Sequence, residues 1–191
     1  GSVNIGGYNY TIGSGSFSNA VSRYGQSHLA QGLSFKCSDG GWDASFVLSR
    51  YDFLRDLQRV PTAPLPGAFD GGPGSIAQMD GTGWYTLDAK ATRHIGETND
   101  LSFGAHYDRY KLALRKFGTP DWLSGPRGAL ANASRGKTAT AALWVQDIWR
   151  FAPDWKATLG GRFENWRAFD GENYSLNAAL DISQPKLSGS Y

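Results

Sequence analysis

The chain of 191 residues has a formal net charge of +2 and a mean hydropathy of −0.41. So small a charge gives no argument for binding to nucleic acid or to an acidic membrane surface. No apolar run approaches the roughly 20 residues that a spanning helix requires, which excludes a helical membrane protein. Aromatic residues make up 14% of the sequence beside 25 glycines, a mixture that points away from a packed helical protein. The single cysteine excludes an intramolecular disulfide framework.

Three stretches in the first half of the chain predict β-strands. Residues 3–14 are rich in glycine and tyrosine, while residues 29–37 and 42–56 alternate between apolar and polar side chains. Because successive side chains of a strand point to opposite faces, this alternation predicts one apolar face and one polar face. The predicted apolar positions are Leu33, Phe35, Cys37, Trp42, Ala44, Phe46 and Leu48.

The second half repeats the pattern over residues 83–95, 101–116 and 138–166. In the last of these, two alternating runs meet at the tight turn Pro153-Asp154, which predicts a hairpin. One side of this hairpin is apolar and the other carries charges of both signs. The predicted apolar positions are Leu87, Ala89, Ala91, Phe103, Ala105, Leu143, Val145, Leu159 and Phe163. We expect about eight strands in all and no helix.

The connections between these strands alternate in length. The short ones have the Gly, Asn, Asp and Pro content of tight turns and comprise residues 38–41, 96–100 and 151–154. The long ones are rich in glycine, proline and serine and comprise residues 15–27, 57–81, 117–135 and 168–183. Up-and-down antiparallel strands with short turns at one end and long loops at the other are typical of a transmembrane β-barrel. Such strands must pair edge to edge, because lipid cannot hydrogen-bond the backbone.

Aromatic residues near the predicted strand ends suit the girdle that flanks the apolar band of such a barrel. These residues are Trp42, Tyr85, Trp149, Trp155 and Trp166. We therefore predict an all-β fold, an antiparallel transmembrane barrel segment with one lipid-facing side and one side toward a lumen.

Several motifs resemble one family of such barrels. The runs at residues 143–149 (LWVQDIW), 152–155 (APDW) and 158–164 (TLGGRFE) resemble the mid-barrel hairpin of TonB-dependent outer-membrane receptors. Residues 83–88 and 104–110 are also similar to strands of that family. The resemblance covers most of the chain, and the order and spacing of the motifs are more specific than any single one of them.

This resemblance implies a monomeric barrel of about 22 strands in the bacterial outer membrane. It also implies a plug domain inside the barrel, TonB as the energy-coupling partner, contact with outer-membrane lipid, and a small-molecule ligand, chiefly a ferric siderophore. We expect residues 1–191 to form the middle of the barrel, an open curved sheet without the plug domain or the C-terminal strands. We expect no enzyme, no cofactor and no metal site, because His28, His94 and His106 lack the spacing of a metal motif and the glycine runs lack the Lys-Ser/Thr ending of a phosphate loop.

Two sets of residues are candidates for functional contacts. Polar residues on the predicted lumen side of the hairpin are Gln146, Lys156, Arg162 and Glu164, which could contact plug or ligand. Candidates in a predicted long loop are Trp122, Arg127 and Arg135, which could hold an aromatic, anionic ferric chelate by stacking and charge. Barrel packing for the first set and a solvated loop for the second are the simpler interpretations.

Two other interpretations stay open at this point. A complete barrel of eight strands with a structural or adhesive role predicts pairing between the first and last strands. A soluble β-sandwich binding module predicts that the faces carrying Leu143 and Leu159 are buried against a second sheet.

Overall fold

A computed structural model describes residues 2–11, 21–175 and 189–190. Its long strands are β3 (Arg23–Asp39), β4 (Trp42–Pro61), β6 (Gly83–Ile95), β7 (Asn99–Thr119), β8 (Leu130–Ala152) and β9 (Trp155–Ser175). Its short elements are β1 (Ser2–Ile5), β2 (Tyr8–Thr11), β5 (Gly74–Gln78), β10 (Gly189–Ser190) and the 3-10 helix η2 (Gly67–Asp70). Within the described ranges, no helix is long and apolar enough to cross a bilayer.

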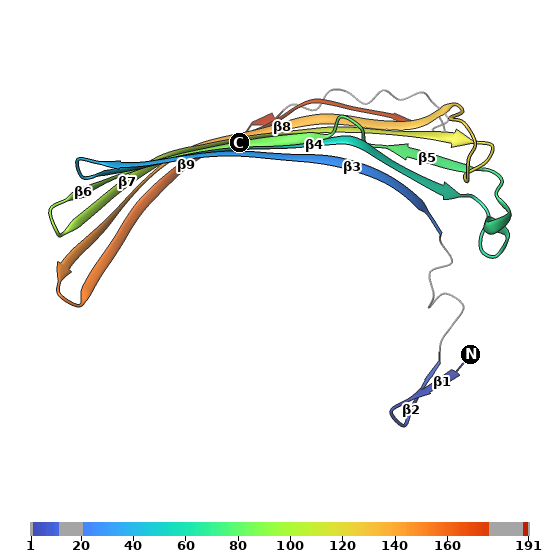
Figure 1. Cartoon of the computed structure of the whole chain (residues 1–191), viewed down its shortest axis with the longest axis horizontal. Helices are drawn as coiled ribbons and strands as arrows, with labels where there is room; N and C mark the ends of the chain where they lie inside the picture. The colour runs from blue at the N-terminus through green and yellow to red at the C-terminus, as the bar shows by residue number, and fades with distance from the viewer. Residues whose placement is uncertain (1, 12–20, 176–188, 191) are drawn as a thin grey trace.

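All strands from β3 onward join one antiparallel sheet, while β1 and β2 form a small separate sheet. The sheet runs in chain order from β3 to β10, and Figure 1 shows it curving as a single arch that does not close on itself. Among the described strands, β3 and β10 lie at opposite edges. The predicted open, curved, all-β sheet is therefore confirmed, and the described strands do not close as a complete eight-stranded barrel requires.

Short turns at one end and longer loops at the other follow the predicted alternation. The turns lie between β3 and β4, β6 and β7, and β8 and β9, with Gly40, Gly41 and Gly96 at positive φ. Such backbone conformations favour glycine because it lacks a Cβ atom. The long loops are shorter than predicted, since β3, β4, β8 and β9 each extend at least five residues into segments expected to be loops. Paired neighbours supply backbone hydrogen bonds there even where the alternation of side chains is poor.

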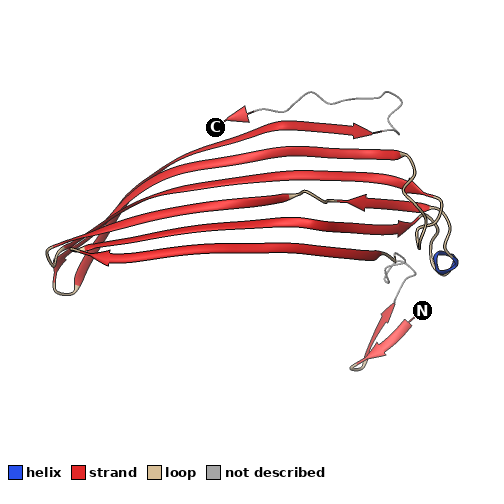
Figure 2. Cartoon of the chain, turned by 45° about the horizontal axis from the view of Figure 1, so that its top comes forward, coloured by secondary structure: helices blue, strands red, loops and turns tan. Residues whose placement is uncertain are grey.

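One strand of the arch is interrupted. Both β5 and β6 pair with β4 on one side and β7 on the other, so together they occupy a single position in the sheet. Figure 2 shows the interruption as a loop between two arrows. Side chains replace the missing ladder bonds: Asp80 Oδ1 accepts from the Asp56 N–H at 2.7 Å, and Thr82 Oγ1 accepts from the Ala113 N–H at 3.0 Å.

Substitution of Asp80 by alanine tests this arrangement. The Asp56 N–H would lose its acceptor in a partly buried site, which costs about 1–3 kcal/mol. We expect the free energy of unfolding in detergent to fall by that amount and the Asp56 amide to exchange faster with solvent. Asp80→Asn retains an acceptor oxygen and should lose less. Equal losses in the two variants would show that the side-chain oxygen does not hold the break together.

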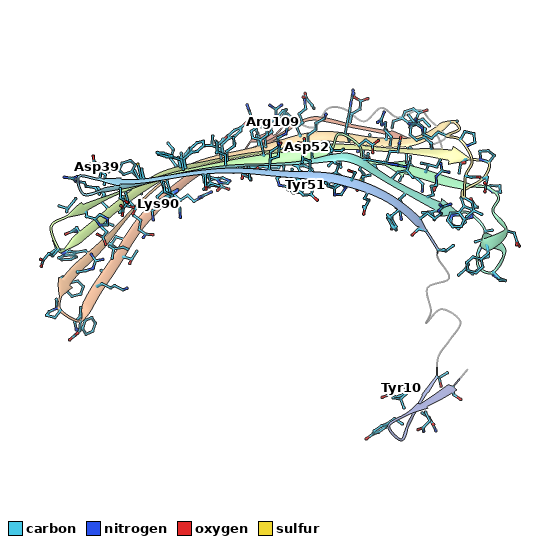
Figure 3. The ribbon with its side chains drawn as sticks, viewed as in Figure 1. Tyr10, Asp39, Tyr51, Asp52, Lys90 and Arg109 are labelled. Atoms are coloured by element: carbon cyan, nitrogen blue, oxygen red, sulfur yellow. The ribbon has the colours of Figure 1, made fainter. Side chains whose placement is uncertain are left out.

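The two faces of the arch differ in chemistry. In Figure 3 Arg109 lies on the convex side of the ribbon, and Tyr51 and Lys90 lie on the concave side. Paired residues of neighbouring strands point to the same face, so the register extends this assignment across the sheet. Side chains on the convex face include Leu33, Phe35, Phe46, Leu48, Leu87, Phe103, Leu143, Val145, Leu159 and Phe163.

This apolar part of the convex face is uncovered. The exposed fractions of Leu143, Leu159 and Phe163 are 65%, 67% and 71%. The prediction from a soluble sandwich, burial of these side chains against a second sheet, is therefore wrong for the chain as described. An exposed apolar surface of this kind marks a membrane or a partner.

The height of the apolar band fits a bilayer. From Trp149 to Ala141, β8 advances about 27 Å at ~3.4 Å per residue, or about 21 Å across a membrane at a tilt of about 40°. Asp147 interrupts this row near the turns, where its Oδ2 accepts from Asn99 Nδ2 at 2.8 Å. Trp42, Trp149 and Trp155 lie on the convex face at the turn end, as an aromatic girdle requires. Trp166 pairs with Thr140 on the concave face, so its predicted place in the girdle is wrong.

Candidate functional site: an aromatic cluster on the concave face

Aromatic side chains gather on the concave face beside the break between β5 and β6. His28 of β3 stacks on Phe53 of β4 with ring centroids 4.1 Å apart, and Tyr51 stacks on Trp84 at 4.5 Å. Edge contacts of Phe53 with Tyr51 and Trp84, at 5.8 and 6.2 Å, join the two pairs. Tyr110 of β7 extends the cluster, 6.3 Å from Trp84. Aromatic pairs in such geometries add about 0.5–1.5 kcal/mol each beyond their buried area.

Irregular register brings these rings together. The pairing of β3 with β4 shifts between Ser27 and His28, so His28 lies opposite Phe53. Beyond the break, Trp84 pairs with Tyr51 and Tyr110 and so faces the same way as both. Three strands therefore contribute to one aromatic surface, which we call the aromatic cluster: His28, Tyr51, Phe53, Trp84 and Tyr110.

A buried carboxylate orients the imidazole of the cluster. The His28 Nε2 atom lies 2.9 Å from Asp56 Oδ2, and the His28 Nδ1 atom lies 2.9 Å from the Tyr51 hydroxyl. The Gln26 amide also donates to Asp56 Oδ2 at 3.0 Å, and Asp56 is 8% exposed. These hydrogen bonds fix both the ring plane of His28 and the hydroxyl of Tyr51. The result is a rigid platform that can stack on a planar group and hydrogen-bond its substituents.

A second polar group lies nearer the turns on the same face. His106 lies between two carboxylates, 2.7 Å from Asp88 and 3.2 Å from Asp108. At the turns, His94 bridges Asp43 at 2.9 Å and Asp100 at 2.7 Å. The concave face is thus hydrogen-bonded from the turn end to the loop end, in contrast to the apolar band on the convex face. This contrast is what a barrel wall between lipid and an aqueous lumen requires.

Comparison with protein families agrees with this wall geometry. Residues 2–191 match the family model described as TonB dependent receptor-like, beta-barrel. The chain belongs to this family. Searches of curated proteins and of solved structures returned no match. The family is one of outer-membrane transport receptors rather than of enzymes, so in this receptor barrel the convex face is the lipid side and the concave face the lumen side.

The register places the four predicted lumen-side residues of the receptor on the concave face. Gln146 pairs with Gly160, Arg162 pairs with Trp144, and Lys156 lies beside the turn between β8 and β9. Arg162 donates twice to Glu164 Oε2, at 2.9 and 2.6 Å, in a partly exposed pair. The contacts of these residues with plug or ligand stay a prediction.

Trp122 lies inside the loop end of the receptor. Only 2% of its surface is exposed, and its Nε1 donates to the carbonyl of Ala68 at 2.9 Å. Its backbone N–H donates to Gly72, so the loop at residues 120–129 is fastened to the loop at residues 62–73. In this arrangement the indole ties two loops together and is not free to stack on a ligand.

The neighbouring Asp121 strengthens this junction. Its carboxylate accepts from the Ser124 hydroxyl at 2.7 Å and from the N–H groups of Leu123 and Gly72. The hydrogen bond from Ser124, followed by that from the Leu123 backbone, lowers the pKa of Asp121 below its usual value. The hydrogen bonds that join the two loops therefore also favour the ionised form of this carboxylate.

The two other loop candidates lie in different surroundings. Arg127 donates to Gln78 Oε1 at 2.8 Å and lies over the Phe117 ring at 5.6 Å. Arg135 belongs to β8 rather than to a loop, because β8 begins at Leu130, and it bonds Glu172 of β9. Its predicted place in a loop is wrong. Whether either residue contacts a ligand stays a prediction.

The aromatic cluster was missed in the sequence because its members are scattered over residues 28–110. A signal is nevertheless present, because the alternation of residues 42–56 and 83–95 places Tyr51 and Trp84 on the polar face. Large aromatic side chains on a face that is otherwise Ser, Thr, Asp and Lys are out of place as solvated residues. In a barrel strand they indicate contact with something inside the lumen.

Proposed function

We propose that this chain forms part of the wall of a receptor that imports a scarce nutrient, a ferric siderophore, with energy coupled through TonB. Residues 1–191 would form the middle of a larger barrel of about 22 strands. Among the described strands, β3 and β10 are the edges of the sheet, which favours this assignment, since an unpaired edge cannot face lipid. A plug domain would fill the lumen, and the Arg162–Glu164 pair and the His94 bridge offer polar contacts for it.

The observation that carries the proposal is the aromatic cluster. It combines stacked rings with fixed hydrogen-bonding groups on the lumen side, near the loop end where a ligand would enter. Iron-chelating groups of siderophores are planar and rich in oxygen, so they can stack on Trp84 or Tyr51 and accept hydrogen bonds. Trp84 is 37% exposed, which leaves part of its ring open to such a contact.

Ligand binding by the full-length receptor tests this proposal. Trp84→Ala removes one stacking surface, and we expect a panel of ferric siderophores to bind about 2- to 10-fold more weakly by calorimetry. Trp155→Ala is the matched control, because Trp155 lies on the convex face at the turn end. Unchanged affinity in Trp84→Ala, or an equal loss in Trp155→Ala, would contradict a role of the cluster in binding.

A further inference from the structure

The convex face changes from apolar to basic toward the loop end. Leu48, Leu87 and Tyr107 form one row across β4, β6 and β7. The next row on this face, two residues nearer the loop end, consists of Arg50, Tyr85 and Arg109. The cations form a basic belt that consists of Arg50, Arg109, Lys111, Lys137 and Arg167. Figure 3 shows Arg109 projecting from this side of the arch. The belt therefore begins where the apolar band ends, at the level of lipid headgroups.

Within the belt, like charges are placed against one another. Lys111 and Lys137 are direct partners across β7 and β8. Arg109, Lys137 and Arg167 surround the ring of Phe169 at 5.3, 5.9 and 5.2 Å. Like charges directly opposite one another destabilise a sheet unless something neutralises them.

Carboxylates neutralise only part of this charge. Asp52 pairs with Arg50 at 2.6 Å, and Asp170 pairs with Lys137 at 2.7 Å. Within the part of the chain that the structure describes, no carboxylate lies within ion-pair distance of Arg109, Lys111 or Arg167. The belt therefore presents surplus positive charge on a face that otherwise meets lipid.

A groove in the convex face lies inside the belt. The groove lies at Gly81 and Gly83, which have no side chains to fill it. Leu48 and Tyr85 line the groove on its apolar side. Arg50, Arg109, Lys111 and Lys137 line its polar side, together with Asp52, which forms an ion pair with Arg50. Gly83 cannot be replaced without strain, because a Cβ there would lie 2.5 Å from the carbonyl of Tyr51. The hollow is thus built into the backbone.

We propose that this groove binds the phosphorylated headgroup of an outer-leaflet lipid. The phosphate would lie against Arg109, Lys111 and Lys137, and the acyl chains would run down the apolar band past Leu48 and Leu87. Charge complementarity selects the headgroup, and continuity with the apolar band selects a lipid over a soluble anion. The site lies on the opposite face from the aromatic cluster, so it does not depend on which nutrient the receptor imports.

Lipid binding by the full-length receptor, delipidated in detergent, tests the site. Native mass spectrometry would compare lipid A bearing both phosphates with the same lipid after dephosphorylation. We expect the phosphorylated form to bind at least 10-fold more tightly. Arg109→Gln/Lys111→Gln/Lys137→Gln should weaken its binding by about 100-fold, at roughly fivefold per cation. Lys111→Arg/Lys137→Arg keeps the charge and should keep the affinity.

Matched controls separate the site from general charge effects. Lys90→Gln/Lys156→Gln/Arg162→Gln removes as many cations from the concave face and should leave lipid binding unchanged. Circular dichroism checks that each variant retains its β-structure. Equal binding of the two lipids, equal loss in the concave-face control, retained binding in the triple glutamine variant, or displacement of the lipid by millimolar inorganic phosphate would each overturn the proposal.

Discussion

Leu143→Arg should destabilise the receptor in a bilayer by about 1–3 kcal/mol, because it places a cation on the lipid side, within the apolar band and about halfway between its middle and its loop-end limit. Leu143 lies on the convex face of β8, where 65% of its surface is uncovered by the rest of the chain. Lipid would surround the new guanidinium with no carboxylate to pair with it. Urea unfolding of the full-length receptor in phospholipid vesicles would measure the loss.

Gln146→Arg provides the comparison for this prediction. Gln146 lies on the same strand, three residues away, but on the concave face. A lumen-side arginine stays hydrated, so we expect a change within about 0.5 kcal/mol. If the two variants were equally destabilised, the assignment of the convex face to lipid would be wrong.

Trp122→Ala should release the two joined loops. The indole is almost completely buried, and removal of a buried tryptophan side chain costs about 3–5 kcal/mol. Its Cβ packs so closely on Gly74 that a Cβ added to that glycine would lie 2.6 Å away. We expect residues 62–73 to lose protection in hydrogen exchange and to become sensitive to protease.

Trp122→Phe separates the packing of the indole from its hydrogen bond. Phenylalanine retains most of the apolar contact but cannot donate to the carbonyl of Ala68, so about 1–3 kcal/mol should be lost. Protection of residues 62–73 should therefore fall in the order wild type, Trp122→Phe, Trp122→Ala. Unchanged protection in the alanine variant would mean that the loops are held by other contacts.

The strands could be predicted from the sequence where lipid imposes a strict alternation. Residues 83–95 were predicted as a strand, and β6 has the same bounds, because every second side chain there faces lipid. β5 was missed, since it has only five residues and was expected to be part of a long loop. Its pairing with β4 and β7, rather than its own side chains, makes it a strand.

The candidate site was harder to predict than the fold. The alternation of side chains in the sequence separates the two faces of the sheet. Which face is convex and which is concave follows only from the curvature of the folded sheet. His28 joined no predicted cluster, because its partner Phe53 lies opposite it only through a register shift that no local pattern indicates. The basic belt could not be predicted from the sequence either. Arg50, Arg109 and Lys137 are distant in sequence and become neighbours only through pairing across strands.

The break between β5 and β6 has a consequence for how the wall can change. Phe53 and Asp56 bond the residues of the break and belong to the concave surface, whereas Gly81 and Gly83 shape the hollow on the convex surface. One short piece of backbone thus supports a feature on each side of a wall that is a single sheet thick. A substitution there that reshapes the lumen side must also alter the lipid side. The two surfaces are therefore constrained to vary together at this point and can vary independently elsewhere along the strands.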